Sequence, residues 1–237
     1  MVLATIITIS SRLMKKIAVA FTLLSCFSFT KAHAQHVPPP CNDYERTLEA
    51  MRTADQALRH RIGELTRFPE ANAKTIKKVT GHIILVDRTN TAKLVSLVKQ
   101  CGWPRPKIHG EKAVDYAWLI AQHADMNQTA QRTFLKHLKQ AVDSGDSPAY
   151  TYAFLADRIA LNEGKPQQYG TQVENKTECD VVIVPLDDYA KADARRKTVG
   201  WPSLKDYVFL LTKHLKEKGC LAPHVAIGTE LPPPLYR

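Results

Sequence analysis

The sequence carries ionisable side chains whose types could move a proton and hold an anionic group. His123 stands two residues before Asp125, and Asp157 directly precedes Arg158. An imidazole and a carboxylate can exchange a proton near neutral pH, and a guanidinium can hold an anion through paired hydrogen bonds. We therefore take His123, Asp125, Asp157 and Arg158 as the candidate catalytic residues. His123 is the candidate for proton transfer, and Arg158 is the candidate for holding an anionic group.

Further polar residues fall at positions where a buried helix face should be apolar. Asp55 lies on an apolar stripe that runs through residues 44–65, and Asp87 and Asn90 lie on another in residues 73–99. Burying an amide or a carboxylate without a partner costs about 1–3 kcal/mol or more, so these side chains need a partner or a ligand. The candidate ligand-binding residues are Asp55, Asp87, Asn90, Gln122, Gln131, Gln167, Tyr169, Thr171, Gln172 and Arg196.

Two other interpretations of these residues remain open. In the first, the polar groups form a structural network, in which Arg158 pairs with an aspartate and His123 is a hydrogen-bonded core histidine. In the second, they bind a metal ion. The sequence has no Glu-x-x-His set, and on a continuous helix His123 and Asp125 stand about 200° apart. Only a helix that ends at Ala124 would let both face one ion, so we predict no metal ligand, and the cofactor stays unknown.

Helices must position these residues, because the apolar residues recur mostly with helical spacing. Start and stop signals divide the chain into seven predicted helices, at about residues 42–65, 73–99, 111–124, 127–142, 147–163, 188–197 and 203–218. Residues 169–173 and 181–184 flank a polar turn and predict a small hairpin. The sequence therefore predicts a mainly α fold, a single-domain helical bundle of about seven helices with a small β-hairpin. This domain covers residues 43–220, between a Pro-rich lead-in at 35–42 and a Pro-rich tail at 221–237 that we expect to be loose.

Residues 1–34 have the three parts of a secretory signal peptide. Lys15 and Lys16 precede an uncharged apolar run at 17–29, and Ala32-His33-Ala34 is a small-x-small cleavage site. We expect cleavage before Gln35 and no transmembrane span after processing, because the apolar run is too short to cross a bilayer comfortably. The protein is therefore expected to be periplasmic or secreted.

Two alternatives concern this N-terminal segment. Met14 directly precedes the two lysines, so it is a candidate for the true start of the chain. Leu23-Leu24-Ser25-Cys26 resembles a bacterial lipobox, and a lipoprotein anchored through Cys26 is therefore the alternative to soluble export.

Four cysteines remain after residues 1–34, namely Cys41, Cys101, Cys179 and Cys220. An even number of cysteines in an oxidising compartment favours two disulfides. Three pairings are open, of which we favour Cys41 with Cys101 and Cys179 with Cys220. Zinc ligation is the rival interpretation, but no Cys-x-x-Cys or His-x-x-x-His pair supports it. A serine nucleophile is not indicated either, because the chain has no Gly-x-Ser-x-Gly elbow.

Composition and charge narrow the class of partner. Of the 237 residues, 44% are hydrophobic and 24% are charged, which is typical of a globular protein. Residues 1–34 hold four basic and no acidic residues, so the formal charge of +10 falls to +6 for the remainder, from 29 Lys and Arg against 23 Asp and Glu. No long basic block is present, and we expect no nucleic-acid partner.

The polar positions coincide with a family resemblance. The chain resembles the bacterial family called domain of unknown function 6624 over roughly residues 43–212. The matching segments are residues 87–94 (Asp87-Arg88-Thr89-Asn90-Thr91-Ala92-Lys93-Leu94), Gly102-Trp103-Pro104, Gln122-His123-Ala124-Asp125 with Gln131, Asp157-Arg158, Gln167-Gln168-Tyr169-Gly170-Thr171-Gln172 and Arg195-Arg196. The resemblance implies a shared polar site and supplies no substrate. The Cys179-containing segment between Gln172 and Pro185 departs from the family pattern.

These observations lead to two expectations about function. The first is an exported protein with a buried polar His/Asp/Arg/Gln pocket, either hydrolase-like or binding a small polar ligand. The second is a periplasmic interaction protein, such as a toxin inhibitor or immunity protein, whose polar cluster is purely structural. An exposed apolar patch would favour the second, and side chains converging in a cleft would favour the first.

Overall fold

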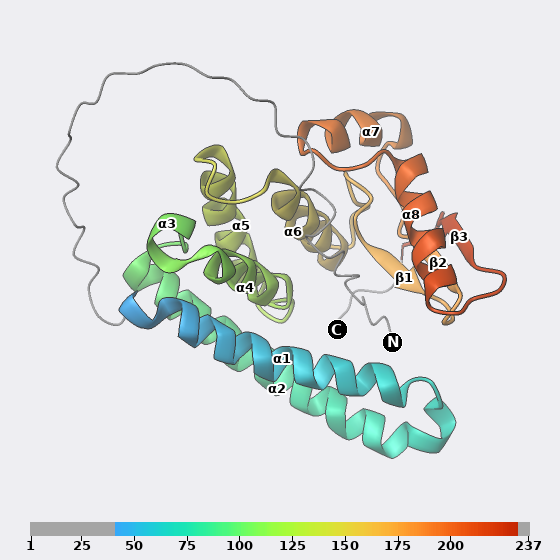
Figure 1. Ribbon diagram of the computed structural model, residues 1–237, viewed down its shortest axis with the longest axis horizontal. Helices are drawn as coiled ribbons and strands as arrows, with labels where there is room; N and C mark the ends of the chain where they lie inside the picture. Colours follow the sequence, from blue (N-terminus) through green and yellow to red (C-terminus); the bar gives the residue numbers. More distant parts are fainter. Residues whose placement is uncertain (1–40, 232–237) are drawn as a thin grey trace.

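The computed structural model describes residues 41–231 (Figure 1). The predicted signal peptide, most of the lead-in and residues 232–237 lie outside the described residues. Helices dominate the described part of the chain, which confirms the predicted mainly α fold. The helices are α1 (Tyr44–Leu65), α2 (Pro69–Cys101), α3 (Pro106–His109), α4 (Glu111–Gln122), α5 (Gln128–Asp143), α6 (Ala149–Asn162), α7 (Tyr189–Thr198) and α8 (Leu204–Glu217). The strands are β1 (Val173–Asn175), β2 (Asp180–Ile183) and β3 (His224–Ile227).

The two longest helices form an antiparallel pair along one side of the molecule (Figure 1). Helix α4 packs on both α1 and α2, and α5 and α6 pack on each other behind it. Tyr44, Leu94 and Phe134, each fully buried, belong to the main apolar core that joins these helices. Burial of such side chains contributes roughly 1.5–3 kcal/mol each, so the positions of α1, α2 and α4 are set by this core. The disulfide Cys41–Cys101, with a Cα–Cα distance of 5.7 Å, closes the open end of the pair.

A small sheet and α8 form a second apolar core near the C-terminus. Strands β1 and β2 are antiparallel, with Val173 opposite Ile183, and β3 is parallel to β2. Val181 and Leu211 are buried between the sheet and α8. The second disulfide, Cys179–Cys220, ties the sheet to the end of α8. Both disulfides have the predicted pairing.

The structure differs from the sequence prediction at several element boundaries. β3 lies in the segment that we expected to be a loose tail, and the hairpin begins at Val173 rather than residue 169 because residues 168–171 are bonded to an aspartate of α6. Helix α1 begins after Asp43 without a side-chain cap. By contrast, the side chains of Asn127 and Ser203 cap α5 and α8.

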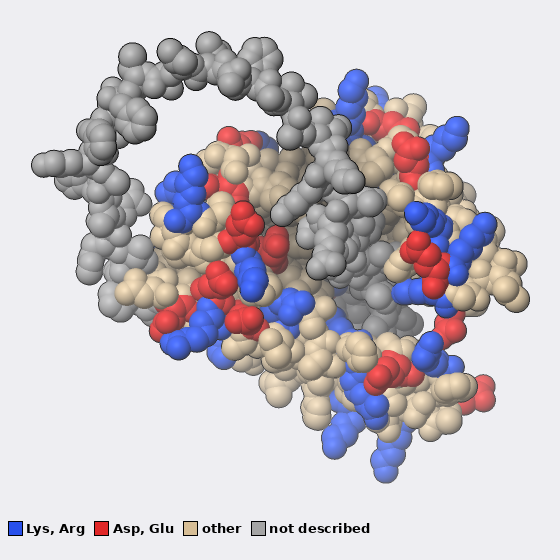
Figure 2. Space-filling model, viewed as in Figure 1, with Lys and Arg blue, Asp and Glu red and all other residues tan. Residues whose placement is uncertain are grey.

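The outer surface mixes charges of both signs. On the face shown in Figure 2, Lys and Arg are interspersed with Asp and Glu over all parts that are described. Among residues 41–231, no helix combines the length and the apolar character that a bilayer crossing requires.

Candidate functional site

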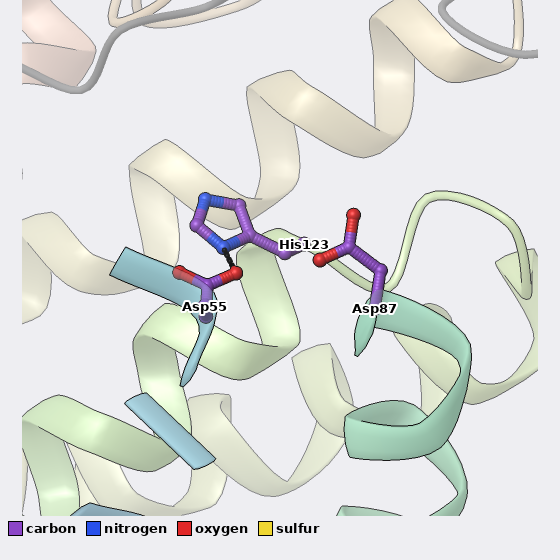
Figure 3. Close-up of side chains that lie close together, drawn as sticks. All are labelled: Asp55, Asp87 and His123. Carbon is purple, nitrogen blue, oxygen red and sulfur yellow. Dashed lines mark hydrogen bonds and ion pairs between the residues drawn. The ribbon is translucent and has the colours of Figure 1, made fainter. Parts of the chain in front are cut away.

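Three helices place a histidine and two aspartates next to one another. Asp55 lies in the middle of α1 and Asp87 in the middle of α2, so the antiparallel packing of these helices brings the two carboxylates together (Figure 3). Helix α4 ends at Gln122, and His123 is its C-terminal cap with φ −93° and ψ 8°. All three side chains are buried. We call Asp55, Asp87, His123 and the neighbouring Arg59 the His–Asp cluster.

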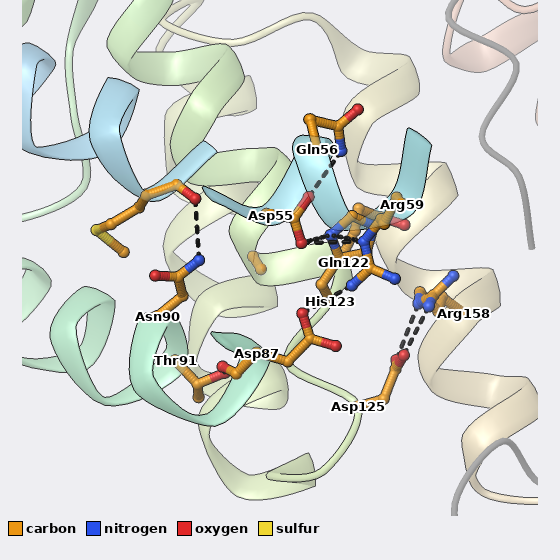
Figure 4. A network of polar contacts seen from close by, with 12 residues as sticks. Asp55, Gln56, Arg59, Asp87, Asn90, Thr91, Gln122, His123, Asp125 and Arg158 are labelled. Atoms are coloured by element: carbon orange, nitrogen blue, oxygen red, sulfur yellow. Dashed lines mark hydrogen bonds and ion pairs between the residues drawn. The ribbon is translucent and has the colours of Figure 1, made fainter. Parts of the chain in front are cut away.

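Short polar contacts hold the His–Asp cluster together (Figure 4). His123 Nδ1 lies 2.8 Å from Asp55 Oδ1. Arg59, one turn after Asp55 on α1, donates from Nε to Asp55 Oδ1 at 3.0 Å and from Nη2 to Asp87 Oδ1 at 2.7 Å. Arg59 Nε also lies 3.1 Å from His123 Nδ1. One guanidinium therefore contacts all three of the other members.

The contact with Asp55 fixes the orientation of the imidazole. With Asp55 ionised, the favourable tautomer carries the proton on Nδ1 and donates it to the carboxylate. A protonated Nδ1 has no lone pair with which to accept a hydrogen bond from Arg59. The closeness of Arg59 to His123 therefore follows from the two ion pairs that Arg59 makes with Asp55 and Asp87. Nε2 is left with its lone pair, and within the described residues it has no hydrogen-bond partner. Figure 3 shows this nitrogen on the side of the ring away from Asp55.

Burial and neighbouring charges separate the pKa values of the cluster. Burial, together with the charge of Arg59, lowers the pKa of His123 to about 4, so the imidazole is neutral at physiological pH. Burial raises the pKa of Asp87 to about 7. The charges of Asp55 and Asp125 add to this rise, and the attraction of Arg59 offsets it only in part. For Asp55, burial is outweighed by the hydrogen bond to His123 and the charge of Arg59, which hold the pKa well below its usual range.

A second group of predicted site residues forms a saturated network beside the cluster, which we call the Asp125 network. Arg158 donates to both oxygens of Asp125, from Nε at 2.8 Å and from Nη2 at 2.6 Å. Asn162 and Gln131 donate to Asp125 Oδ1 at 2.7 and 3.0 Å. Burial would raise the pKa of Asp125, but the charge and hydrogen bonds of Arg158 outweigh it and lower the pKa. Asp125 thus faces Arg158 and not His123.

A third group holds the segment at residues 167–172, and we call it the loop anchor. The carboxylate of Asp157 accepts from the backbone N–H of Gln168, Tyr169 and Thr171 at 2.7–3.0 Å and from Thr171 Oγ1 at 2.9 Å. Arg196 donates to the carbonyls of Tyr169 and Pro202 from the other side. Burial raises the pKa of Asp157 despite these bonds.

Glycine and glutamine complete the loop anchor. Gly170 has φ +67°, a conformation that favours glycine, and a Cβ there would lie 2.9 Å from a methyl carbon of Leu204, which would have to move. The backbone N–H of Gln172 donates to Gln167 Oε1 at 2.8 Å, and Gln172 Nε2 donates to Phe154 O at 3.1 Å. These side chains are satisfied by local backbone and do not point to the His–Asp cluster.

The two remaining predicted residues lie between helices. Asn90 donates to Met51 O at 3.1 Å and so links α2 to α1. Gln122, with its amide oxygen turned toward the available donors, accepts from Leu155 N at 2.9 Å. Of the fourteen predicted catalytic and ligand-binding residues, only Asp55, Asp87 and His123 belong to the His–Asp cluster.

Sequence reasoning missed Arg59 and Asn162, which complete the cluster and the Asp125 network. Arg59 lies off the apolar stripe of α1, so a search for polar residues on that stripe passes it over. The signal that could have found it is the spacing of four from Asp55, which is typical of an ion pair on one helix face.

The cluster also has a composition that can coordinate a metal ion. One ligand atom each from Asp55, Asp87 and His123 lies within 4.8 Å of the other two. The sequence analysis predicted no metal ligand and tested only His123 with Asp125, whose side chain faces Arg158. The structure thus brings together a different set of potential ligands.

Together, the fold and the site define a mainly α domain with a buried, charged cluster between three helices. The family model of a family of unknown function (DUF6624) matches residues 42–218, and the chain belongs to this family, as the resemblance implied. No curated protein and no solved structure matches the chain.

Proposed function

We propose that the protein is an exported, hydrolase-like protein that binds a small polar ligand at the His–Asp cluster. The observation that carries this proposal is a pair of acceptor atoms without hydrogen bonds in nearly enclosed side chains. His123 Nε2 and Asp87 Oδ2 have no partner within residues 41–231, although His123 and Asp87 are each only 4% exposed. Neither atom is fully enclosed, so both can be reached from solvent, and they are the atoms of the cluster that a small polar ligand can contact.

Arg59 provides the route by which a ligand would enter. Its side chain is 23% exposed, whereas the side chains of Asp55 and Asp87 that it bridges are at most 2% exposed. A rotation of this long side chain toward solvent would open both carboxylates. The Asp125 network borders the cluster. Arg158, which the sequence analysis proposed for holding an anionic group, can do so only if its two hydrogen bonds to Asp125 open.

His123 is the residue that we propose for proton transfer if the ligand is a substrate. Its Nδ1 is held by Asp55, so Nε2 is the nitrogen that can reach a ligand. A neutral imidazole at physiological pH is able to accept a proton, and an aspartate behind it stabilises the cation that forms.

A ligand screen with matched histidine variants tests this proposal. We expect at least one compound from a panel of small polar metabolites to raise the melting temperature of the parent but not of His123→Asn. His82→Asn is the control, because His82 is an exposed histidine of α2. The proposal fails if every compound that shifts the parent shifts His123→Asn equally, with both variants folded by circular dichroism.

Export is supported by the disulfides and by the signal peptide expected at residues 1–34. Two disulfides and the absence of a membrane-spanning helix among the described residues are compatible with a periplasmic or extracellular location. The alternative is that the exported protein stays attached to a membrane through an acylated Cys26.

The interaction-protein alternative stays a prediction. The large apolar side chains that are exposed come from several separate elements, and these residues are Phe68, Leu85, Val95, Met126, Tyr189, Phe209, Leu221 and Leu231. The converging side chains of the His–Asp cluster support the ligand-binding proposal more directly.

A further inference from the structure

The charges around the His–Asp cluster indicate the sign of the missing ligand. Three carboxyl groups, from Asp55, Asp87 and Asp125, share this region with the two guanidinium groups of Arg59 and Arg158. His123 is enclosed among them and 4% exposed. When Asp87 is ionised, the three carboxylates outnumber the two guanidinium groups, so a cation would balance the charge of the region whereas an anion would add to the excess.

The ligand atoms favour a metal ion over an organic cation. Two carboxylates and an imidazole, converging from three separate elements, are the donor types that first-row divalent ions accept. Their ligand atoms lie within 4.8 Å of one another, which small side-chain rotations can reduce to the spacing around one ion. Asp87 Oδ2, on a side chain 2% exposed, has no hydrogen bond within the described residues, and Figure 3 shows the Asp87 carboxylate directed at His123 and Asp55.

Arg59 already places a positive charge between these atoms. Its Nε and Nη2 atoms lie 2.7–3.1 Å from Asp55 Oδ1, Asp87 Oδ1 and His123 Nδ1. The other guanidinium of the region, that of Arg158, is 5% exposed and bound through two donors to Asp125. Arg59 is 23% exposed and gives each carboxylate a single nitrogen, so it is the cation that can leave.

We infer that Asp55, Asp87 and His123 form a binding site for one divalent transition-metal ion, such as Zn²⁺ or Mn²⁺, which enters when Arg59 turns out to solvent. The inference rests on the proposed function, because the ion is the ligand of the His–Asp cluster or one component of that ligand. Three protein ligands leave coordination positions open for water or a polar group of a second ligand. With the ion in place, His123 is a metal ligand and not a proton acceptor.

Metal titration of untagged protein tests the inference. The full chain is treated with a chelator, transferred to metal-free buffer and titrated calorimetrically with ZnCl₂ and MnCl₂, and CoCl₂ provides a visible absorption signal. We expect one ion per chain. Asp87→Asn, which preserves the shape of the side chain, should weaken binding by on the order of tenfold or more. Arg59→Met should tighten binding by on the order of tenfold, because it removes the competing charge.

Matched variants control for these two changes. Glu49→Gln removes an exposed carboxylate of α1, and Arg61→Met removes an exposed guanidinium of α1, so both should bind metal as the parent does. Circular dichroism establishes that each variant is folded. If Arg59→Met does not fold, Arg59→Lys takes its place, because the shorter cation competes less effectively with the ion.

Two results would overturn the inference. One is that neither the parent nor the folded Arg59 variant binds any of the three ions. The other is that binding persists unchanged in Asp87→Asn, which would place the ion elsewhere. Should a His123-dependent metabolite shift survive in chelator while no ion binds, the ion is excluded and the proposed function still stands.

Discussion

At the scale of single residues, the same burial has opposite consequences for Asp87 and His123. Burial disfavours the charged form of both, so the pKa of the acid rises to about 7 and the pKa of the base falls to about 4. The folded protein therefore keeps a proton on Asp87 that the unfolded chain has released, and it keeps His123 neutral where the unfolded chain would be charged. The two residues give stability opposite dependences on pH.

Replacing Asp87 with asparagine removes one of the two pH dependences of stability. The stability that protonated Asp87 contributes is complete below its unfolded pKa of 3.8 and is lost as pH rises through about 7. Asp87→Asn should therefore be more stable than the metal-free parent at pH 8, by at most about 4 kcal/mol, and equal to it near pH 4. Urea denaturation in chelator at pH 4, 6 and 8 measures the difference. If Asp87→Asn is instead less stable than the parent at pH 8, the charge of Arg59 fully compensates the buried charge of Asp87, and the prediction is wrong.

The His123 dependence should then be easier to measure in Asp87→Asn, because the opposing contribution of Asp87 is absent. The stability contributed by neutral His123 is present above its unfolded pKa of 6.5 and is lost as pH falls through about 4. We expect the unfolding free energy of Asp87→Asn to rise between pH 4 and pH 6.5, whereas that of the parent changes less. A flat profile for Asp87→Asn, measured in the same buffers, would contradict the burial argument for the imidazole.

Part of the cluster could be predicted at this scale because a polar residue on an apolar stripe stands out. Asp55 and Asp87 were found in this way and His123 was chosen for its ability to transfer a proton, and all three are buried at the site. Arg59 was not, because arginine at a half-exposed helix position is ordinary in any sequence. Which polar residues share a partner depends on side-chain direction, so Asp125 and Asp157 were placed in the same pocket as His123 although they face Arg158 and residues 167–172.

At the scale of elements, the ends of helices decide what the polar residues contact. Helix α4 stops at Gln122, which turns His123 toward α1 and α2 and leaves Asp125 free to meet α6. Long helices were predictable from periodicity, but α3 has only four residues and too few positions to show a period. Strand β3 lies between Pro223 and the proline run at 232–234, and it exists because it pairs with β2, which local sequence does not encode.

The loop anchor makes a prediction about one element. Asp157→Ala would leave three backbone N–H groups and one hydroxyl of residues 168–171 without their acceptor, at a cost of roughly 3–5 kcal/mol. Asp157→Asn should cost less, because its amide oxygen still accepts. Denaturant titration measures both, and Asp143→Ala, at an exposed position of α5, should change stability by under about 0.5 kcal/mol. Equal stabilities for Asp157→Ala and Asp143→Ala would contradict this role.

At the scale of the whole molecule, the two disulfides secure two different apolar cores. Cys41–Cys101 spans 60 residues and closes the pair of α1 and α2, which carry three members of the His–Asp cluster. Cys179–Cys220 spans 41 residues and holds the sheet on α8. Loop closures of this length stabilise a folded chain by about 4 kcal/mol each on the chain-entropy account, which is a large share of an ordinary net stability.

The protein should therefore depend on an oxidising compartment for its stability. When the full chain is made in a bacterium, we expect the product to begin at Gln35 and to contain no free thiol. A version that starts at Gln35 and stays in the reducing cytoplasm should hold free thiols and unfold at a lower denaturant concentration, because it lacks both loop closures. Intact mass, thiol titration and urea denaturation measure these properties.

Leu23→Arg, which puts a charge into the apolar run of the signal peptide, should make the full chain behave like the cytoplasmic version. A lipid mass on Cys26 would replace soluble export by anchoring, and a full chain that retains residues 1–34 with reduced cysteines would contradict export altogether.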